Sequence, residues 1–170
     1  MTDTPSRPGQ ALLLVDLQRW IVELDLAPRS GQAVLHRCVA LRDAFEKAQA
    51  PVIFVRYLRP GRQTDPGDEW VPELVPAAHN PVVTKNGQDA FAATGLHDIL
   101  GTLDVQHLTV AGIATANGIL TTATTALHLG YATAVVEDAT SSLDETGHRS
   151  ALQILRASGA DVITAGAPSS

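Results

Sequence analysis

The stretch from Leu108 to Thr140 reads LTVAGIATANGILTTATTALHLGYATAVVEDAT, and it decides how the chain folds. Two apolar runs, Leu108 to Ala111 and Ala132 to Val136, have the length and the β-branched content of buried strands. The Ala, Thr and Leu residues between them span the length of a helix, and Gly130 is a residue type that commonly ends one. This stretch therefore predicts a strand-helix-strand unit.

Small residues fill the turn between the first of these strands and the helix, from Gly112 to Gly118. Here a chain leaves the carboxyl edge of a parallel sheet, and the free N–H groups of a helix N-terminus point at whatever lies above them. We therefore expect a ligand site at this turn, with Thr115, Asn117 and Gly118 as residues that contact a substrate.

The remaining elements alternate in the same way along the 170 residues, a length that fits a single domain. Right-handed crossovers then favour a three-layer α/β fold with a parallel sheet and helices on both faces. The tails, residues 1–9 and 166–170, are expected to be frayed. Strands are predicted at residues 11–15, 51–57, 81–85, 106–112 and 161–164, and helices at residues 30–49, 94–102 and 142–156, the last with a Ser142-Leu-Asp-Glu145 capping box.

Composition limits the classes of function. The net charge of −6 and the absence of any basic block argue against a nucleic-acid partner. No apolar run approaches the roughly 18 residues of a membrane helix, so we expect a cytoplasmic protein without a membrane partner. The single cysteine, Cys38, falls on the apolar face of the helix predicted at 30–49, where it is expected to be a core residue without catalytic function.

Two ionisable residues come at the carboxyl ends of predicted strands, the edge at which open α/β sheets bind ligands. Asp16 follows the strand at 11–15, and Lys85 ends the strand at 81–85. From position alone, an Asp here is equally able to accept hydrogen bonds from loop N–H groups, and a lone Lys is most often solvated. Gln18 and Tyr57 come near the ends of adjacent strands and are candidates for contacts with the substrate.

A segment rich in Pro and Gly runs from Leu58 to Asn80. Irregular segments of this length in a small domain are usually functional, and we interpret it as a lid over the site with Trp70 as its apolar contact. A plain surface excursion is the alternative. The six histidines include no H-x-H or H-x-x-x-H pair, so no metal is expected.

The stretch that begins at Gly112 resembles the signature of the isochorismatase-like hydrolase superfamily. The chain also has a D-x-Q motif at Asp16 and a Lys followed by an aromatic residue, Thr and Leu at Lys85, as family members do. The resemblance implies a six-stranded sheet of order 3-2-1-4-5-6, with Asp16 and Lys85 as catalytic residues. The matching positions within the signature are Gly112, Ile113, Thr115, Ile119, Thr122, Ala123, Ala126, Gly130, Tyr131, Asp138 and Ala139.

The sequence departs from the resemblance at Gly118, where the cysteine hydrolases of the family carry their nucleophile. Without a thiol, the covalent route is closed. Isochorismatases also have Gly or Ala at this position, and they hydrolyse a vinyl ether without a covalent intermediate, using an acid in place of a nucleophile. Three hypotheses follow: an isochorismatase-type hydrolase without a cofactor, a different acid/base enzyme such as a lyase or isomerase, and a non-catalytic ligand-binding protein.

The hypothesis of an acid-driven enzyme predicts that Asp16 lies in a partly desolvated pocket with a raised pKa. The resemblance further implies a cis peptide bond before Ala114 or Thr115, and a homodimer or homotetramer. A second argument for an oligomer is that a domain this small has few places to bury Trp70. His148 matches a family position too, but we expect it to be a hydrogen-bonded structural residue.

Overall fold

The computed structural model describes residues 7–61 and 69–165, and it contains one six-stranded parallel sheet. The strand order is β3-β2-β1-β4-β5-β6, which confirms the predicted topology. The strands are β1 (Gln10–Val15), β2 (Val52–Tyr57), β3 (Val82–Lys85), β4 (His107–Ile113), β5 (Ala132–Ser141) and β6 (Asp161–Ile163).

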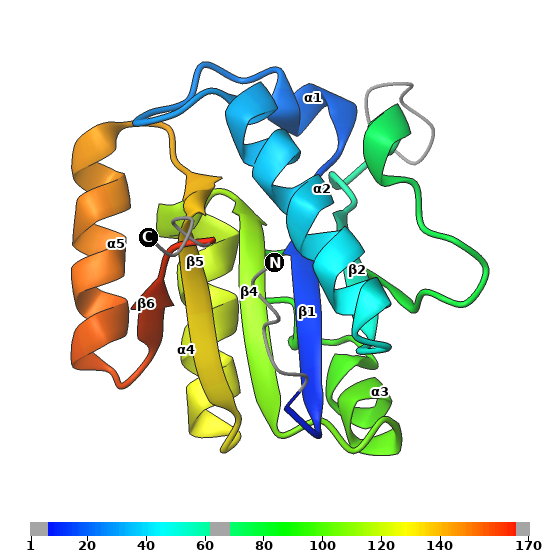
Figure 1. Cartoon of the computed structure of the whole chain (residues 1–170). Helices are drawn as coiled ribbons and strands as arrows, with labels where there is room; N and C mark the ends of the chain where they lie inside the picture. The colour runs from blue at the N-terminus through cyan, green and yellow to red at the C-terminus, as the bar shows by residue number, and fades with distance from the viewer. Residues whose placement is uncertain (1–6, 62–68, 166–170) are drawn as a thin grey trace, which may run out of the picture.

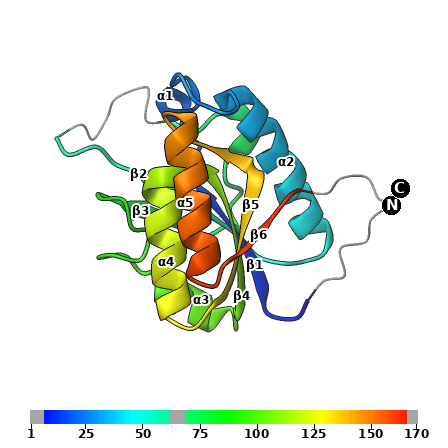
Figure 2. The same ribbon diagram turned by 90° about the vertical axis from the view of Figure 1, so that its left-hand side faces the viewer.

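Helices cover both faces of this sheet, as right-handed crossovers require. Figure 2 shows α3, α4 and α5 on one face and α2 on the other, so the fold has the three predicted layers. The helices are α1 (Arg19–Val22), α2 (Gly31–Lys47), α3 (Leu96–Thr102), α4 (Leu120–His128) and α5 (Glu145–Ala157), with short helical turns η2 (Pro72–Leu74) and η3 (Thr115–Ile119).

Strand β1 is the centre of the core (Figure 1), because its side chains are buried on both faces of the sheet. Leu13 and Val15 pack into the apolar cluster beneath α3, α4 and α5. Leu12 and Leu14 pack into the cluster beneath α2. The continuous apolar run of β1 in the sequence follows from this double burial.

The strand register brings the carboxyl ends of the inner strands to one edge. Val15 at the end of β1 pairs with Val55 in β2 and with Gly112 in β4. One strand further out, Tyr57 at the end of β2 pairs with Lys85 at the end of β3. Residues far apart in the sequence therefore meet above the end of β1.

Some boundaries differ from the sequence predictions. Helix α5 begins at Glu145, and its N-cap is Asp144, whose carboxylate accepts a hydrogen bond of 2.6 Å from the N–H of Gly147. The predicted capping box at Ser142 is therefore wrong, because Ser142 is held in an isolated antiparallel bridge with Ala27. At the other end of the chain, the Gly9 carbonyl accepts a hydrogen bond of 2.8 Å from the N–H of Gln106, so the expected N-terminal tail is tied to the sheet at this residue.

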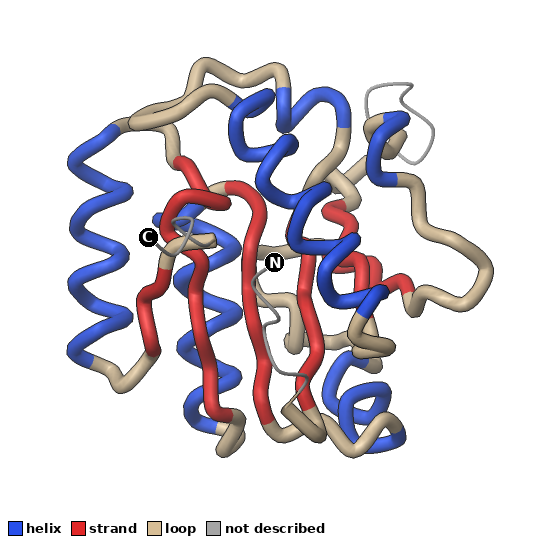
Figure 3. Tube along the Cα trace, viewed as in Figure 1, coloured by secondary structure: helices blue, strands red, loops and turns tan. Residues whose placement is uncertain are grey.

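The face that carries α2 also has a hollow of about 760 Å³ beside this helix. It extends over β4, β5 and β6, and Figure 3 shows these strands side by side next to α2. Residues such as Leu41, Thr109 and Ala134 line it. None of the sequence-predicted site residues lines this hollow.

Candidate active site

Asp16 and Lys85 form a buried ion pair. Nζ of Lys85 lies 2.9 Å from Oδ2 of Asp16, and the two residues are only 3% and 6% exposed, respectively. Ionisable residues are rarely buried this deeply, and a buried ion pair is in itself weak support for a structural role because desolvation offsets its attraction. The structure thus brings together the two residues that the sequence placed at strand ends.

Asp16 is held in place by the backbone at the end of β1. Its N–H donates to the carbonyl of Val55 at 2.9 Å, which extends the ladder between β1 and β2 by one residue. Its φ of 56° lies in the left-handed region, which disfavours most residues other than glycine but which Asp tolerates. Backbone outliers of this kind cluster at functional sites.

Lys85 has two further neighbours besides Asp16. Its ammonium donates to the carbonyl of Gly87 at 2.9 Å and lies 5.0 Å from the centroid of the Tyr57 ring. A cation over an aromatic face is stabilised by the ring quadrupole, which partly replaces lost hydration. The half-buried Tyr57 is therefore a wall of the site, in agreement with its position at the end of β2.

The environment of Asp16 favours its protonated form. Burial raises the pKa of the Asp16 carboxyl from 3.8 to about 6, although the charge of Lys85 and its hydrogen bond act in the opposite direction. The carboxyl also has an unequal environment, because its Oδ1 is buried without a hydrogen-bond partner among the described residues. Asp16 is thus suited to give up a proton near neutral pH, as the sequence hypothesis required.

The turn between β4 and α4 lies next to the ion pair. The peptide bond between Ile113 and Ala114 is cis, which confirms the expected geometry at this position. The turn itself, η3, is a π-helical turn, and within it Asn117 departs from helical dihedrals with φ −118° and ψ −106°. A Cβ atom placed on Gly118 would lie 3.4 Å from Nζ of Lys85 and 3.5 Å from Oδ2 of Asp16. Gly118 therefore faces the ion pair directly.

Thr115 does not face the ion pair. It is fully buried, and its hydroxyl shares a hydrogen bond of 2.7 Å with Nδ1 of His148 in α5. Burial is the main cause that lowers the pKa of His148. This hydrogen bond fixes the beginning of the η3 turn to α5, so the Thr115 side chain supports the turn. His148 has the structural role expected from the sequence.

Gln18 and Trp70 also have different surroundings from those expected. The Gln18 side chain is fully buried and bridges the backbone of Tyr57: its Nε2 donates to the Tyr57 carbonyl at 2.9 Å, and its Oε1 accepts from the Tyr57 N–H at 2.7 Å. Trp70 packs edge-on against Phe54, with ring centroids 5.6 Å apart. None of these contacts involves Asp16 or Lys85. Residues 62–68 of the expected lid lie outside the described residues.

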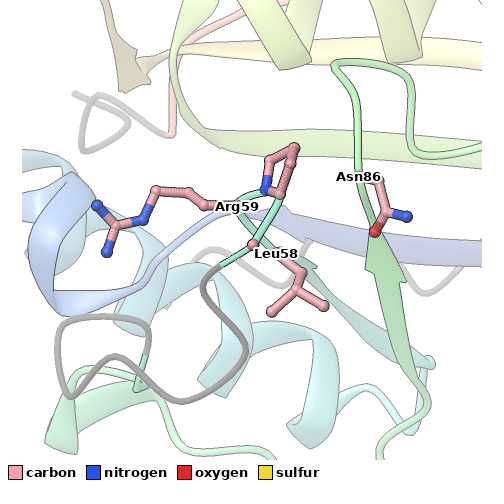
Figure 4. A pocket seen from close by; sticks show the side chains of 5 residues that line it. Leu58, Arg59 and Asn86 are labelled. Carbon is pink, nitrogen blue, oxygen red and sulfur yellow. The ribbon is translucent and has the colours of Figure 1, made fainter.

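Two residues that the sequence reasoning missed extend the aromatic wall. The Trp20 ring lies 6.3 Å from that of Tyr57, and the Arg59 guanidinium lies 4.4 Å from the Trp20 ring centroid. The nearest signal in the sequence was an aromatic residue four positions after Asp16. Beside Arg59, a hollow of about 160 Å³ opens over the ends of β2 and β3, lined by Leu58 to Gly61 and by Asn86 (Figure 4).

Cys38 lies away from the ion pair. Its thiol is fully buried in the cluster beneath α2, and burial raises its pKa, so it is not available as a nucleophile. Among residues 7–61 and 69–165, no cluster of three or more His, Cys, Asp or Glu residues is suited to a metal ion. In the same ranges, no helix has the length and apolar character needed to cross a membrane.

The isochorismatase domain family matches residues 10–167 of this chain. The chain therefore belongs to the isochorismatase family, and this confirms the resemblance read from the sequence. The family includes hydrolases, and the fold is the one expected for such an enzyme.

Known relatives agree with this assignment. The chain is 32% identical over 165 residues to an uncharacterised isochorismatase family protein, YwoC of Bacillus subtilis, with 85% of this chain and 84% of YwoC covered. It is 34% identical over 145 residues to the streptothricin hydrolase of Streptomyces noursei, with 81% of this chain but only 56% of that protein covered. The structure of an isochorismatase family protein from Burkholderia thailandensis superposes with a TM-score of 0.87 at 30% identity, covering 94% and 93% of the two chains.

Proposed function

We propose that this protein is a thiol-free hydrolase that cleaves a small vinyl ether of the isochorismate type, with Asp16 as the proton donor. The observation that supports the proposal most directly is the placement of Gly118 beside the buried pair of Asp16 and Lys85. Such a site provides one proton and one fixed positive charge, and Gly118 contributes no thiol to it.

The reaction begins with transfer of the Asp16 proton to the methylene carbon of the enol ether. The resulting oxocarbenium carbon adds a water molecule, and the Asp16 carboxylate takes up the proton that this water loses. The hemiketal then collapses: its C–O bond to the alcohol breaks, the hydroxyl proton passes to the departing oxygen, and pyruvate forms. The substrate and one water molecule are consumed, and Asp16 is returned to its protonated form.

The test is release of pyruvate from isochorismate by the purified protein. The Asp16→Asn variant is the matched control, because the amide keeps the shape of the carboxylate but has no acidic proton. We expect its turnover to fall about a hundredfold or more, the usual scale of general acid catalysis. Wild-type protein that releases no pyruvate, or a variant as active as wild type, would contradict the proposal.

The similarity to a streptothricin hydrolase supports a second candidate, an amide hydrolase. We rank it lower, since Gly118 offers no thiol for the covalent route of the cysteine enzymes. Streptothricin is therefore the second substrate to test. Because hydrolysis of its amide releases no pyruvate, the readout is the addition of one water to the compound, measured by mass spectrometry. A lyase, an isomerase or a non-catalytic ligand-binding protein remain the alternatives if neither compound is turned over.

The homo-oligomer and the cytoplasmic location also remain proposals. One of the arguments for an oligomer no longer holds, because Trp70 is packed against Phe54 within the chain itself. The family resemblance is the remaining support. Light scattering at micromolar protein concentration tests it, and a monomer mass would contradict it.

A further inference from the structure

Gly118 is not a glycine that the backbone requires. It is absent from the residues with positive φ, and a Cβ atom built on it would meet its neighbours at 3.4 to 3.5 Å, which is ordinary van der Waals contact. Glycines kept for steric reasons show much shorter distances. The fold therefore does not require glycine at this position.

The three atoms nearest to that Cβ position are all polar. They are the carbonyl oxygen of Gln88 at 3.4 Å, Nζ of Lys85 at 3.4 Å and Oδ2 of Asp16 at 3.5 Å. A methyl group would find no apolar partner among these atoms. The space in front of the Gly118 Cα is thus bounded by one cation and two acceptor oxygens.

Each of these groups has hydrogen-bonding capacity left. The Lys85 ammonium has three N–H donors, and two of them bind Asp16 and the Gly87 carbonyl. Oδ2 of Asp16 accepts from Lys85 and retains a second lone pair. Among the described residues, the Gln88 carbonyl accepts one long hydrogen bond of 3.5 Å, from the Thr122 hydroxyl. One donor and two acceptors therefore remain, and this set matches the three hydrogen bonds that a typical buried water makes.

We propose that Lys85 Nζ, Asp16 Oδ2 and the Gln88 carbonyl bind the hydrolytic water in front of Gly118. The water accepts from the ammonium and donates to the two oxygens, so that its free lone pair points away from them. This inference rests on the proposed vinyl ether hydrolysis for its chemistry, but the water site itself follows from the geometry of the ion pair.

Asp16 then acts first as an acid and afterwards as a base. Its proton passes to the substrate carbon in the first step, which leaves the carboxylate. Oδ2 of this carboxylate accepts the proton of the bound water as the oxygen of that water bonds to the oxocarbenium carbon. Asp16 is thus protonated again at the end of each turnover.

A crystal structure of the wild-type protein at high resolution tests the water site without any substrate. We expect an ordered water about 2.7–3.2 Å from Lys85 Nζ, Asp16 Oδ2 and the Gln88 carbonyl. In Gly118→Val, the branched side chain occupies this space, and we expect the water to be absent. A well-ordered wild-type site without a water on these atoms would overturn the inference.

Kinetics with isochorismate test the role of the water. Gly118→Val is expected to lose about a hundredfold in kcat with little change in KM, because a misplaced reactant costs this much although the binding contacts remain. The control is Gly101→Val at an exposed position of α3, where a Cβ meets nothing within 4 Å, and we expect wild-type kinetics from it. Equal kcat for Gly118→Val and wild type would overturn the catalytic role. A bound water in a protein that does not cleave isochorismate would refute the proposed function and support the water site.

Discussion

Gly112 and Gly118 lie six residues apart on the same connection, yet the molecule uses them for opposite purposes. A Cβ on Gly112 would lie 2.1 Å from the carbonyl oxygen of Val15, and its φ is 126°. A Cβ on Gly118 would meet no atom closer than 3.4 Å. The first glycine is required by the backbone, whereas the second leaves space that the backbone does not need.

The two glycines affect Asp16 in different ways: Gly112 helps to position it, and Gly118 leaves space beside its carboxyl. Gly112 allows the end of β4 to pass close to Val15, the residue before Asp16, and so fixes where the carboxyl stands. Gly118 lies on the other side of that carboxyl, next to Lys85. We therefore expect substitutions at Gly112 to affect folding, and substitutions at Gly118 to affect reactivity at nearly constant stability.

The largest effect is predicted for Gly112→Ala. A methyl group 2.1 Å from a backbone oxygen cannot be accommodated without separating β1 from β4, and the left-handed φ adds strain. We expect a loss of more than about 4 kcal/mol in the free energy of unfolding, a size reserved for severe packing errors. Gly118→Ala should stay within about 1 kcal/mol of wild type. Urea unfolding followed by circular dichroism measures both, and similar losses would break the comparison.

A smaller effect is predicted for the carboxyl that lies between the two glycines. Folding raises the pKa of Asp16 from 3.8 to about 6, so the folded state holds this proton more tightly than the unfolded chain does. Its contribution to stability is complete below pH 3.8 and is lost as the pH rises through 6. At about 1.4 kcal/mol per pKa unit, the loss amounts to about 3 kcal/mol.

The measurement is the difference in unfolding free energy between wild type and Asp16→Asn at pH 4 and at pH 7. The pH dependence that the other titrating groups contribute is common to both proteins and cancels in this difference. The variant has no titrating group at position 16. We expect wild type to lose stability relative to the variant by about 2 kcal/mol over this range, since part of the effect lies below pH 4. A difference that does not change with pH would show that the Asp16 carboxyl is not desolvated.

Much of the fold could be predicted from patterns of consecutive residues. The run of apolar residues in β1 reports burial on both faces, and Ser30 before α2 is the helix cap that was expected, since its hydroxyl accepts from the Ala33 N–H. Strand β5, by contrast, was predicted to end at Val136 but continues to Ser141. The extension pairs with the end of β4, and Arg29 donates to its carbonyls at Glu137 and Thr140; such contacts between distant residues leave no local pattern.

The same limit applies to the site. Asp16 and Lys85 were predictable because the carboxyl ends of parallel strands share an edge of the sheet. The hydrogen bonds of Gln18 to the Tyr57 backbone, and of Thr115 to His148, depend on the distances between strands and helices. The Gln88 carbonyl is a backbone atom, which no pattern of side chains reveals.

The smallest effect on stability and the sharpest test of the comparison come from Gly118→Cys. The new Cβ would lie 3.4 Å from the Lys85 ammonium, and a nearby cation lowers the pKa of a thiol and makes it more reactive. Wild type is the control, because its only thiol, Cys38, is fully buried with a raised pKa. Labelling with iodoacetamide at pH 7, read by mass spectrometry, should modify position 118 faster than free cysteine and leave Cys38 unmodified. If the thiol at position 118 reacts no faster than free cysteine, then Gly118 is not the residue that faces the cation. The proposed difference between the two glycines, in which Gly118 affects reactivity, would then be wrong.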